Sequence, residues 1–291
     1  MKFRERLSTG KPILADGAMG TMLQKRGFRN VCLEELNLTY PEVTKEITRA
    51  YHNAGAELLQ ANTFGANPWR LSEYGVADKT ESINRTAVEI VREVVGENVW
   101  ITGSCGPSGK QLLPFGELSC EEYVTGISRQ IGSLIETGVD AVSIETVMDV
   151  EEAVLAVKTA REISPVIVII CTGTFTCTPA GYFTPYGNSP EDFVHRLEEA
   201  GADVVGANCS VGMEAMIGIA RIMRKSTDIP LLIRPNAGLP EIIDGEPVWR
   251  ETPEKFAEST RKLIDSGVNI IGGCCGTTPE HIRKIREVLG G

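Results

Sequence analysis

One local pattern occurs four times along the chain and constrains its fold more than any other feature. Each copy has a glycine after a helix-like segment, then an apolar residue, an acidic or amide residue and an apolar run: NAGAELLQANTFG, ETGVDAVSIETV, EAGADVVGANCS and DSGVNIIGGCCG. Glycine at the end of an amphipathic segment is typical of a helix C-terminal cap. The pattern therefore predicts a helix, a short turn and a buried strand, with the turns at Gly55, Gly138, Gly201 and Gly267.

The rest of the chain supplies four further apolar runs of strand length. They are PILADG near 12–17, VWITGSCGP near 99–107, VIVIICTGTF near 166–175 and PLLIRPNAG near 230–238. Helical patterns separate the eight runs, near residues 41–54, 78–95, 119–137, 149–162, 189–200, 213–226, 252–266 and 279–289. Nearly continuous apolar strands that alternate with helices indicate a parallel sheet covered by helices.

Eight such units predict an α/β fold, a single (β/α)₈ TIM barrel that spans residues 1–291. A doubly wound open sheet is the alternative, because a count of strands does not show whether the sheet closes. The length allows one domain, since barrels of about 200 to 250 residues or more form single units. No linker, low-complexity tract or charge block divides the chain. In a barrel, catalytic groups lie at the C-terminal ends of the strands.

Charge and hydropathy restrict the partners. Lys and Arg total 29 against 39 Asp and Glu, which gives a net charge of −10 and argues against nucleic acid or an anionic membrane surface as the main partner. No apolar run approaches the 18 or so residues of a membrane span, and the N-terminus lacks the apolar middle of a signal peptide. We therefore expect a cytoplasmic protein.

Eight cysteines in a reducing compartment are more often free thiols, metal ligands or reactive groups than structural disulfides. Five stand singly and are expected to be ordinary core or loop residues: Cys32, Cys105, Cys120, Cys171 and Cys177. The other three lie at the predicted C-terminal ends of two strands: Cys209, Cys274 and Cys275. Strands six and eight of a barrel are near neighbours, so these three thiols are the candidates for a shared site.

Adjacent side chains of a strand point to opposite faces, so Cys274 and Cys275 can meet one ion only where the backbone leaves the pleat. Glycines at 272, 273 and 276 are expected to supply the conformational freedom for this. Three thiolates with an open fourth position match the tetrahedral preference of catalytic zinc. The residues alone also allow three thiols that simply pack together, or a strained disulfide between the adjacent pair.

The motif GGCCGTTPEHI, together with ANCS, ADGAMGTML, ELLQANTFGAN and PNAG, resembles the homocysteine S-methyltransferase family. The similarity is greatest to the N-terminal homocysteine-binding domain of cobalamin-dependent methionine synthases, and it runs in the same order from about residue 12 to 289. The resemblance implies a (β/α)₈ barrel that binds homocysteine and holds zinc through Cys209, Cys274 and Cys275. A metal ion deprotonates a coordinating thiol, so the substrate sulfur would need no side-chain general base.

The same resemblance implies the groups that hold the amino-acid part of homocysteine. The backbone of Gly17 and Ala18 is expected to receive the carboxylate, and Glu145 to pair with the ammonium. Both roles agree with the chemistry of anion-binding glycine-rich turns and of charge pairing. Three further strand-end residues are candidates for orienting the substrate or its anchors: Asp16, Asn62 and Asn236. Capping of turns is the alternative role for these three.

The methyl donor stays open. ADGAMGTML and ELNLTYPE favour the cobalamin-linked branch, with cobalamin on a separate domain or protein, because the sequence stops at Gly291 before any such domain. The alternatives are a stand-alone enzyme that uses S-methylmethionine or betaine, a different thiol acceptor, or a zinc-stabilised, non-catalytic module that docks a corrinoid protein. The segment 171–193 departs from the family form, and its Tyr182, Phe183 and Tyr186 are expected either to shape the donor side or to pack together.

Overall fold

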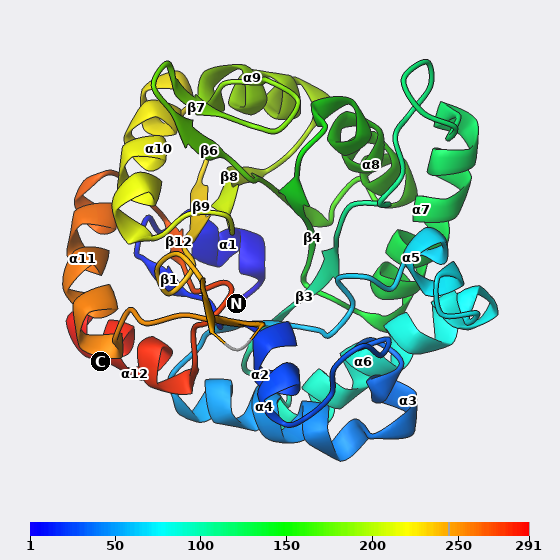
Figure 1. The fold of residues 1–291 in the computed structure, drawn as a ribbon, viewed down its shortest axis with the longest axis horizontal. Helices are drawn as coiled ribbons and strands as arrows, with labels where there is room; N and C mark the ends of the chain where they lie inside the picture. Colours follow the sequence, from blue (N-terminus) through cyan, green and yellow to red (C-terminus); the bar gives the residue numbers. More distant parts are fainter. Residues whose placement is uncertain (244, 291) are drawn as a thin grey trace.

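The computed structural model describes residues 1–243 and 245–290, and its centre is a barrel of eight parallel strands (Figure 1). In chain order the strands are β1 (Ile13–Leu14), β2 (Leu58–Gln60), β3 (Trp100–Cys105), β4 (Ala141–Val147), β5 (Val168–Gly173), β8 (Val204–Asn208), β9 (Leu231–Arg234) and β12 (Ile270–Ile271). Their order around the sheet is β1-β12-β9-β8-β5-β4-β3-β2. A parallel bridge between Ala15 and Leu58 joins the two edges, which confirms the barrel and excludes the open sheet.

The predicted helices are present close to their expected bounds and form the outer ring in Figure 1. They are α4 (Pro41–Asn53), α6 (Thr80–Val95), α7 (Cys120–Thr137), α8 (Val150–Ile163), α9 (Pro190–Ala200), α10 (Met213–Ser226), α11 (Pro253–Asp265) and α12 (Pro279–Val288). The four turn glycines all have positive φ, at Gly55, Gly138, Gly201 and Gly267. Each therefore ends a helix in a conformation that glycine adopts without strain, as the sequence predicts.

Several short elements were not predicted. They are α1 (Phe3–Leu7), α2 (Gly20–Lys25), α3 (Leu36–Thr39), α5 (Pro68–Ser72), η1 (Ala77–Lys79) and two hairpins, β6 (Thr176–Thr178) with β7 (Gly181–Phe183) and β10 (Glu241–Ile243) with β11 (Glu246–Val248). Elements this short show no clear period in the sequence, and tertiary contacts decide whether they form.

The helix α1 closes the N-terminal end of the barrel. Phe3 and Leu7 join the apolar cluster inside the strands, and the Phe3 ring lies 5.6 Å from that of Trp100. Figure 1 shows α1 within the ring of strands. Because apolar side chains fill this end, a polar cavity can form only at the other end, where the strands have their carboxyl ends.

None of the helices in the described part of the chain combines the length and the apolar composition that crossing a bilayer requires.

Candidate metal centre and its cavity

The three cysteines of the two motifs lie together at the carboxyl ends of the strands. Cys209 follows β8, while Cys274 and Cys275 follow β12, and these two strands flank β9. The Sγ atoms of the three residues lie within 4.8 Å of one another, and those of Cys209 and Cys275 are 3.8 Å apart. Strand order thus brings together thiols that are 66 residues apart in the sequence.

Turns in the backbone direct all three thiols to the same place. Cys209 and Ser210 have φ values of 64° and 60°, and Gly276 has a φ of 81°. After β12 ends, the Thr277 N–H donates to the Cys274 carbonyl at 3.1 Å and closes a turn around the two cysteines. A turn lacks the alternation of a strand, so adjacent side chains can face the same side.

Two of the three glycines around the cysteine pair act differently from the prediction. Gly276, after the pair, has a positive φ, whereas Gly272 and Gly273, before it, do not. A Cβ on Gly272 would lie 2.6 Å from the Asp16 carbonyl oxygen, and a Cβ on Gly273 would lie 2.4 Å from Thr277 Oγ1. These two positions therefore need glycine for close packing against neighbouring segments, and the expectation that they supply unusual dihedral angles is wrong.

The geometry of the thiols fits a tetrahedral zinc ion. Two thiolates that bind zinc at about 2.3 Å, at the tetrahedral angle, stand ~3.8 Å apart. The observed separation of the Cys209 and Cys275 sulfurs is 3.8 Å. Within residues 1–243 and 245–290, no His, Asp or Glu joins this group. Such a set provides three protein ligands, which is the number typical of catalytic rather than structural zinc sites.

The three thiols share negative charge unevenly. Hydrogen bonds from Cys274 and Cys275 lower the pKa of Cys209, and the Asn236 amide acts in the same direction. The same sulfur contacts raise the pKa values of Cys274 and Cys275. One thiolate therefore forms readily, while three together require a nearby positive charge. A divalent cation among them would supply that charge.

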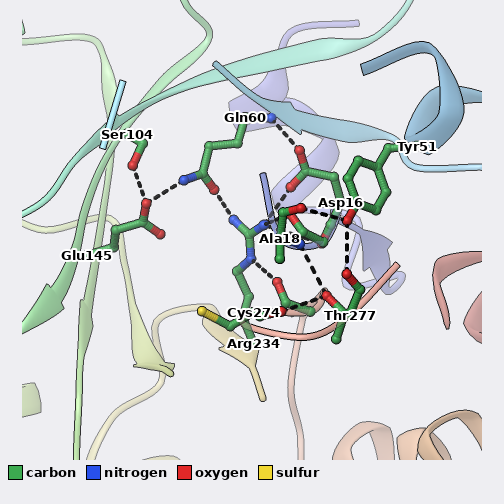
Figure 2. Close-up of polar contacts among 11 residues, drawn as sticks. Asp16, Ala18, Tyr51, Gln60, Ser104, Glu145, Arg234, Cys274 and Thr277 are labelled. Atoms are coloured by element: carbon green, nitrogen blue, oxygen red, sulfur yellow. Dashed lines mark hydrogen bonds and ion pairs between the residues drawn. The ribbon is translucent and has the colours of Figure 1, made fainter. Parts of the chain in front are cut away.

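A buried ion pair lies beside Cys274, as Figure 2 shows. Arg234, at the end of β9, donates from Nη2 to Asp16 Oδ1 at 2.6 Å, and the two side chains are only 7% and 5% exposed. Arg234 also donates from Nε to the Gly273 carbonyl at 3.0 Å. Asp16 accepts a further bond from the Gln60 N–H at 2.8 Å. The pair thus ties β1, β2 and β9 to the segment that carries the cysteines.

Glu145, near the end of β4, lies at the far end of the same network. Arg234 donates to the Gln60 side-chain oxygen, and Gln60 Nε2 donates in turn to Glu145 Oε1. The Ser104 hydroxyl donates to the same Oε1 atom. Burial raises the pKa of Glu145, whereas Arg234 and the two donors act to lower it. Of its two carboxylate oxygens, only Oε1 makes hydrogen bonds with the residues drawn in Figure 2.

These groups surround one cavity of about 320 Å³. Its wall includes Glu145, Arg234, the three cysteines and the glycine-rich segment after β1. Asp16 and Asn236 are not in this wall, and they act on it through Arg234 and Cys209. The cavity therefore joins a group of thiols to a carboxylate that comes from a different side of the barrel.

The segment after β1 lies in the wall close to the cysteine turn. The Ala18 N–H donates to Thr277 Oγ1 at 3.2 Å, and the Tyr51 hydroxyl donates to the Ala18 carbonyl at 2.9 Å. A Cβ on Gly17 would lie 2.7 Å from Thr277 Oγ1 and 2.8 Å from the Tyr51 hydroxyl oxygen, so only glycine fits there. The Gly17 N–H has no partner among the residues that the structure describes. Of the two predicted donors, the Ala18 N–H is thus already engaged with Thr277, whereas the Gly17 N–H is not.

The chain matches a known family over almost its whole length. The family model for homocysteine S-methyltransferase covers residues 13–289. The chain belongs to the homocysteine S-methyltransferase family. The match therefore includes the whole barrel, from β1 to α12.

Individual relatives agree with this assignment. Methionine synthase from Mycobacterium leprae is 32% identical over 301 residues, and the one from Mycobacterium tuberculosis is 31% identical. Both alignments cover 95% of this chain but 24% of the relative, so the chain spans about a quarter of their length. The metallated form of the homocysteine methyltransferase MmuM from Escherichia coli has the same fold, with a TM-score of 0.80, 22% identity and 98% of each chain covered.

Two asparagines that were predicted as site residues make contacts within the protein. Asn62 lines the cavity, but its Nδ2 donates to the Leu33 carbonyl at 2.8 Å and to Asn37 Oδ1 at 3.1 Å. Asn236 contacts Cys209, and its Oδ1 is buried without a hydrogen-bond partner in the described part of the chain. These contacts favour roles in fixing loops and a thiol, and direct binding of substrate stays a prediction for both.

Several residues of the network were not predicted from the sequence. Those missed are Tyr51, Gln60, Ser104, Arg234 and Thr277. One signal was available, because Arg234 is the only charged residue in the apolar run PLLIRPNAG. A charge at the end of a buried strand is costly unless it is paired, so it marks a site. Uncharged polar residues such as Gln60 carry no comparable signal.

The aromatic residues of segment 171–193 lie outside the cavity. Neither Tyr182, Phe183 nor Tyr186 is in its wall. Tyr182 packs against α10, where a Cβ on Gly218 would meet its hydroxyl at 2.5 Å, and the Tyr186 hydroxyl accepts from Gln111 Nε2 at 2.9 Å. The hairpin β6–β7 therefore packs on neighbouring elements, rather than only on its own aromatics.

The five single cysteines lie outside the group of three thiols, as expected, and the three histidines lie outside it too. Cys32, Cys105 and Cys171 are buried, and Cys120 and Cys177 are exposed. The histidines lie on helices and not at strand ends: His52 on α4, His195 on α9 and His281 on α12.

Proposed function

We propose that this chain binds homocysteine and transfers a methyl group to its sulfur, with zinc held by Cys209, Cys274 and Cys275. The observation that carries the proposal is that three thiols meet in a cavity whose wall also contains the carboxylate of Glu145. An amino acid with a terminal thiol presents a sulfur at one end and an ammonium at the other, so it matches both groups. Membership of the homocysteine S-methyltransferase family supports the same substrate.

The sulfur must lose its proton before it can attack a methyl carbon. A free thiol has a pKa of about 8.5, so only a few per cent is ionised near neutral pH. Zinc bound by the three cysteines would lower the pKa of a further coordinating thiol. No histidine is among the described residues that line the cavity, which agrees with a reaction that needs no general base.

The amino-acid part of homocysteine has a matching set of groups. Ser104 and Gln60 both donate to Glu145 Oε1, which favours the carboxylate form and leaves Oε2 to accept from the substrate ammonium. Because burial raises the pKa of Glu145, a cation beside it is a favourable partner. The backbone N–H groups of Gly17 and Ala18 are the proposed donors to the substrate carboxylate.

For the methyl donor we favour a methylcorrinoid on a separate domain or protein. The similarity to methionine synthases supports this choice, and the product would be methionine, formed in the cytoplasm. A small donor, S-methylmethionine or betaine, is the alternative. The candidate from another class is a non-catalytic module, stabilised by zinc, that docks a corrinoid protein. The three-ligand set speaks against this module, because structural zinc sites usually have four protein ligands.

A donor panel tests the activity. The zinc-loaded protein is incubated with homocysteine and with methylcobalamin, a methylated corrinoid protein, S-methylmethionine or betaine, and methionine is measured. We expect methionine with a corrinoid donor and little with the small donors. If only a small donor supports transfer, that small molecule would replace the methylcorrinoid as the proposed donor. If the zinc-loaded protein transfers no methyl group from any donor, the non-catalytic docking module would be favoured.

A calorimetric measurement tests the binding step without a donor. Homocysteine that binds as a thiolate at neutral pH must release close to one proton per site, because most of the free thiol is protonated. Titrations in buffers of different ionisation enthalpy give this number. Binding without proton release would mean that the sulfur does not bind a metal in this cavity.

A further inference from the structure

The side chain of Asn208, directly before Cys209, connects the ends of three strands. It is 1% exposed. Its Oδ1 accepts from the Thr146 N–H and from the Thr172 hydroxyl, each at 2.8 Å, and its Nδ2 donates to Thr146 Oγ1, also at 2.8 Å. The amide therefore links β8 to β5 and, across it, to β4, and both its oxygen and its nitrogen take part in these bonds.

Two of the three bonds go to a residue with an unusual backbone. Thr146 has a φ of 58°, and the pairing of β4 with β5 shifts register between Ile144 and Val147. A β-branched residue rarely adopts positive φ, because the conformation is strained. Asn208 binds both the N–H and the hydroxyl of Thr146, so its contacts offset this strain and hold the irregularity in place.

The irregularity determines where Glu145 points. A bulge in a strand re-aims the side chain beside it, and Glu145 directly precedes Thr146. In the observed arrangement Glu145 lies in the cavity wall and accepts from Ser104 and Gln60. Relaxation of Thr146 to an ordinary strand conformation would change this direction.

The same asparagine also determines the start of the turn that carries a thiol. Cys209 and Ser210 follow it with φ values of 64° and 60°, and the Cys209 N–H donates to the Arg234 carbonyl at 3.1 Å. Because the Asn208 side chain is anchored to β4 and β5, the position of Cys209 is tied to that of Glu145. One buried amide thus connects the two ends of the cavity.

We infer that Asn208 is a positioning residue that sets the spacing between Glu145 and Cys209, and so selects an amino-acid thiol of the length of homocysteine. The inference rests on the proposed function, in which these two residues act on opposite ends of the substrate. With the spacing held, cysteine is one methylene too short to reach both ends. Without the Asn208 amide the spacing relaxes, so homocysteine binds less tightly and the preference over cysteine decreases.

The variant Asn208→Ala tests the inference. We expect the KM for homocysteine to rise about tenfold, as the strain at Thr146 is no longer offset. The ratio of kcat/KM for homocysteine to that for cysteine should fall, while zinc per chain stays near the wild-type value. In a Thr146→Gly background, glycine adopts positive φ without strain, so the same substitution should raise KM only about twofold.

A matched control separates positioning from stability. Asn84 is also fully buried, and its Nδ2 donates to the carbonyls of Ala66 and Thr80 at 2.8 and 2.7 Å, but it does not line the cavity. Asn84→Ala should lower Tm by about 5 °C, as should Asn208→Ala, yet leave the KM unchanged. An Asn208→Ala protein that loses only stability, like this control, would overturn the inference, as would an equal KM effect in both Thr146 backgrounds.

Failure of the proposed function gives a different result. If the wild-type protein methylates no homocysteine, the claim about substrate length falls with that function. The contacts themselves are then tested by Tm alone. A loss of Tm in Asn208→Ala that is not reduced by Thr146→Gly would show that Asn208 does not hold the bulge.

Discussion

The two ends of the barrel each contain an arginine–aspartate ion pair, but in opposite surroundings. At the N-terminal end, Asp203 pairs with Arg4 and Arg161, each at 2.7 Å, and the Arg4 side chain is 52% exposed. At the carboxyl end, Arg234 pairs with Asp16 at 2.6 Å, and both side chains are almost completely buried. Exposed pairs contribute little to stability, whereas a buried pair must offset a large cost of desolvation.

The difference shows which end is shaped for stability and which for chemistry. Apolar side chains from α1 and the strands fill the N-terminal half of the barrel. The carboxyl half instead buries a polar chain from Asp16 through Arg234 and Gln60 to Glu145. Buried charge with shifted pKa values is typical of functional sites. The chain of buried polar and charged groups inside the barrel thus lies where the cavity opens.

The largest effect is expected from removing a ligand at the carboxyl end. Cys209→Ser should lose most of the zinc and reduce methyl transfer about a thousandfold, because a neutral hydroxyl replaces a thiolate and the metal is worth several kcal/mol. The exposed Cys120→Ser provides the matched control, with full zinc content and activity. Metal analysis and the transfer assay measure both. Full zinc retention in the Cys209 variant would remove this thiol from the centre.

The next effect compares the two ion pairs directly. Arg234→Leu leaves Asp16 buried and unpaired, and it should lower the free energy of unfolding by about 3–5 kcal/mol. Arg4→Leu removes a partly exposed partner and should cost about 1 kcal/mol or less. Urea denaturation of both variants measures the difference. Equal losses would show that the two ends do not differ in the way that their burial suggests.

A smaller effect is expected at the far end of the polar chain. Glu145→Gln should keep the zinc and the fold but weaken homocysteine binding about 10- to 150-fold, which corresponds to about 1.5–3 kcal/mol for a charge-assisted hydrogen bond. An analogue of homocysteine without the ammonium, 4-mercaptobutyrate, should bind the variant and the wild type equally. Unchanged affinity for homocysteine itself would remove Glu145 from the substrate site.

The smallest effect concerns pH at the N-terminal end. Although burial opposes it, hydrogen bonds from Arg4, from the Ile169 N–H and from Arg161 lower the pKa of Asp203. A carboxyl with a lowered folded pKa stabilises the fold above its unfolded pKa of about 4, and this stability is lost as the pH falls through the folded value. The small destabilisation by Asp203→Asn should therefore be largest near neutral pH and shrink below about pH 4. Urea denaturation of both proteins at several pH values measures this difference. A destabilisation that grows as the pH falls would contradict the prediction.

Local features of the sequence were sufficient for the fold and for the identity of the thiols. Alternating apolar runs and helical patterns predicted eight strands, and the glycines after the helices marked the turns. These signals depend on residues close together in the chain, so they can be recognised without knowledge of the tertiary contacts. The motifs ANCS and GGCCG pointed to Cys209, Cys274 and Cys275, and the order of the strands brought them within reach of one another.

Only the tertiary structure decided how these groups are held. Gln60 connects Arg234 to Glu145, and Asn208 reaches Thr146 across an intervening strand. Both residues lie in motifs of the sequence, but the motifs do not show which distant residues they contact. Even the reason for Gly272 and Gly273 was misjudged, because it depends on atoms of Asp16 and Thr277 that approach from other segments. A hydrogen bond forms between atoms about 3 Å apart, and strand register together with closure of the barrel determines which distant atoms reach that distance.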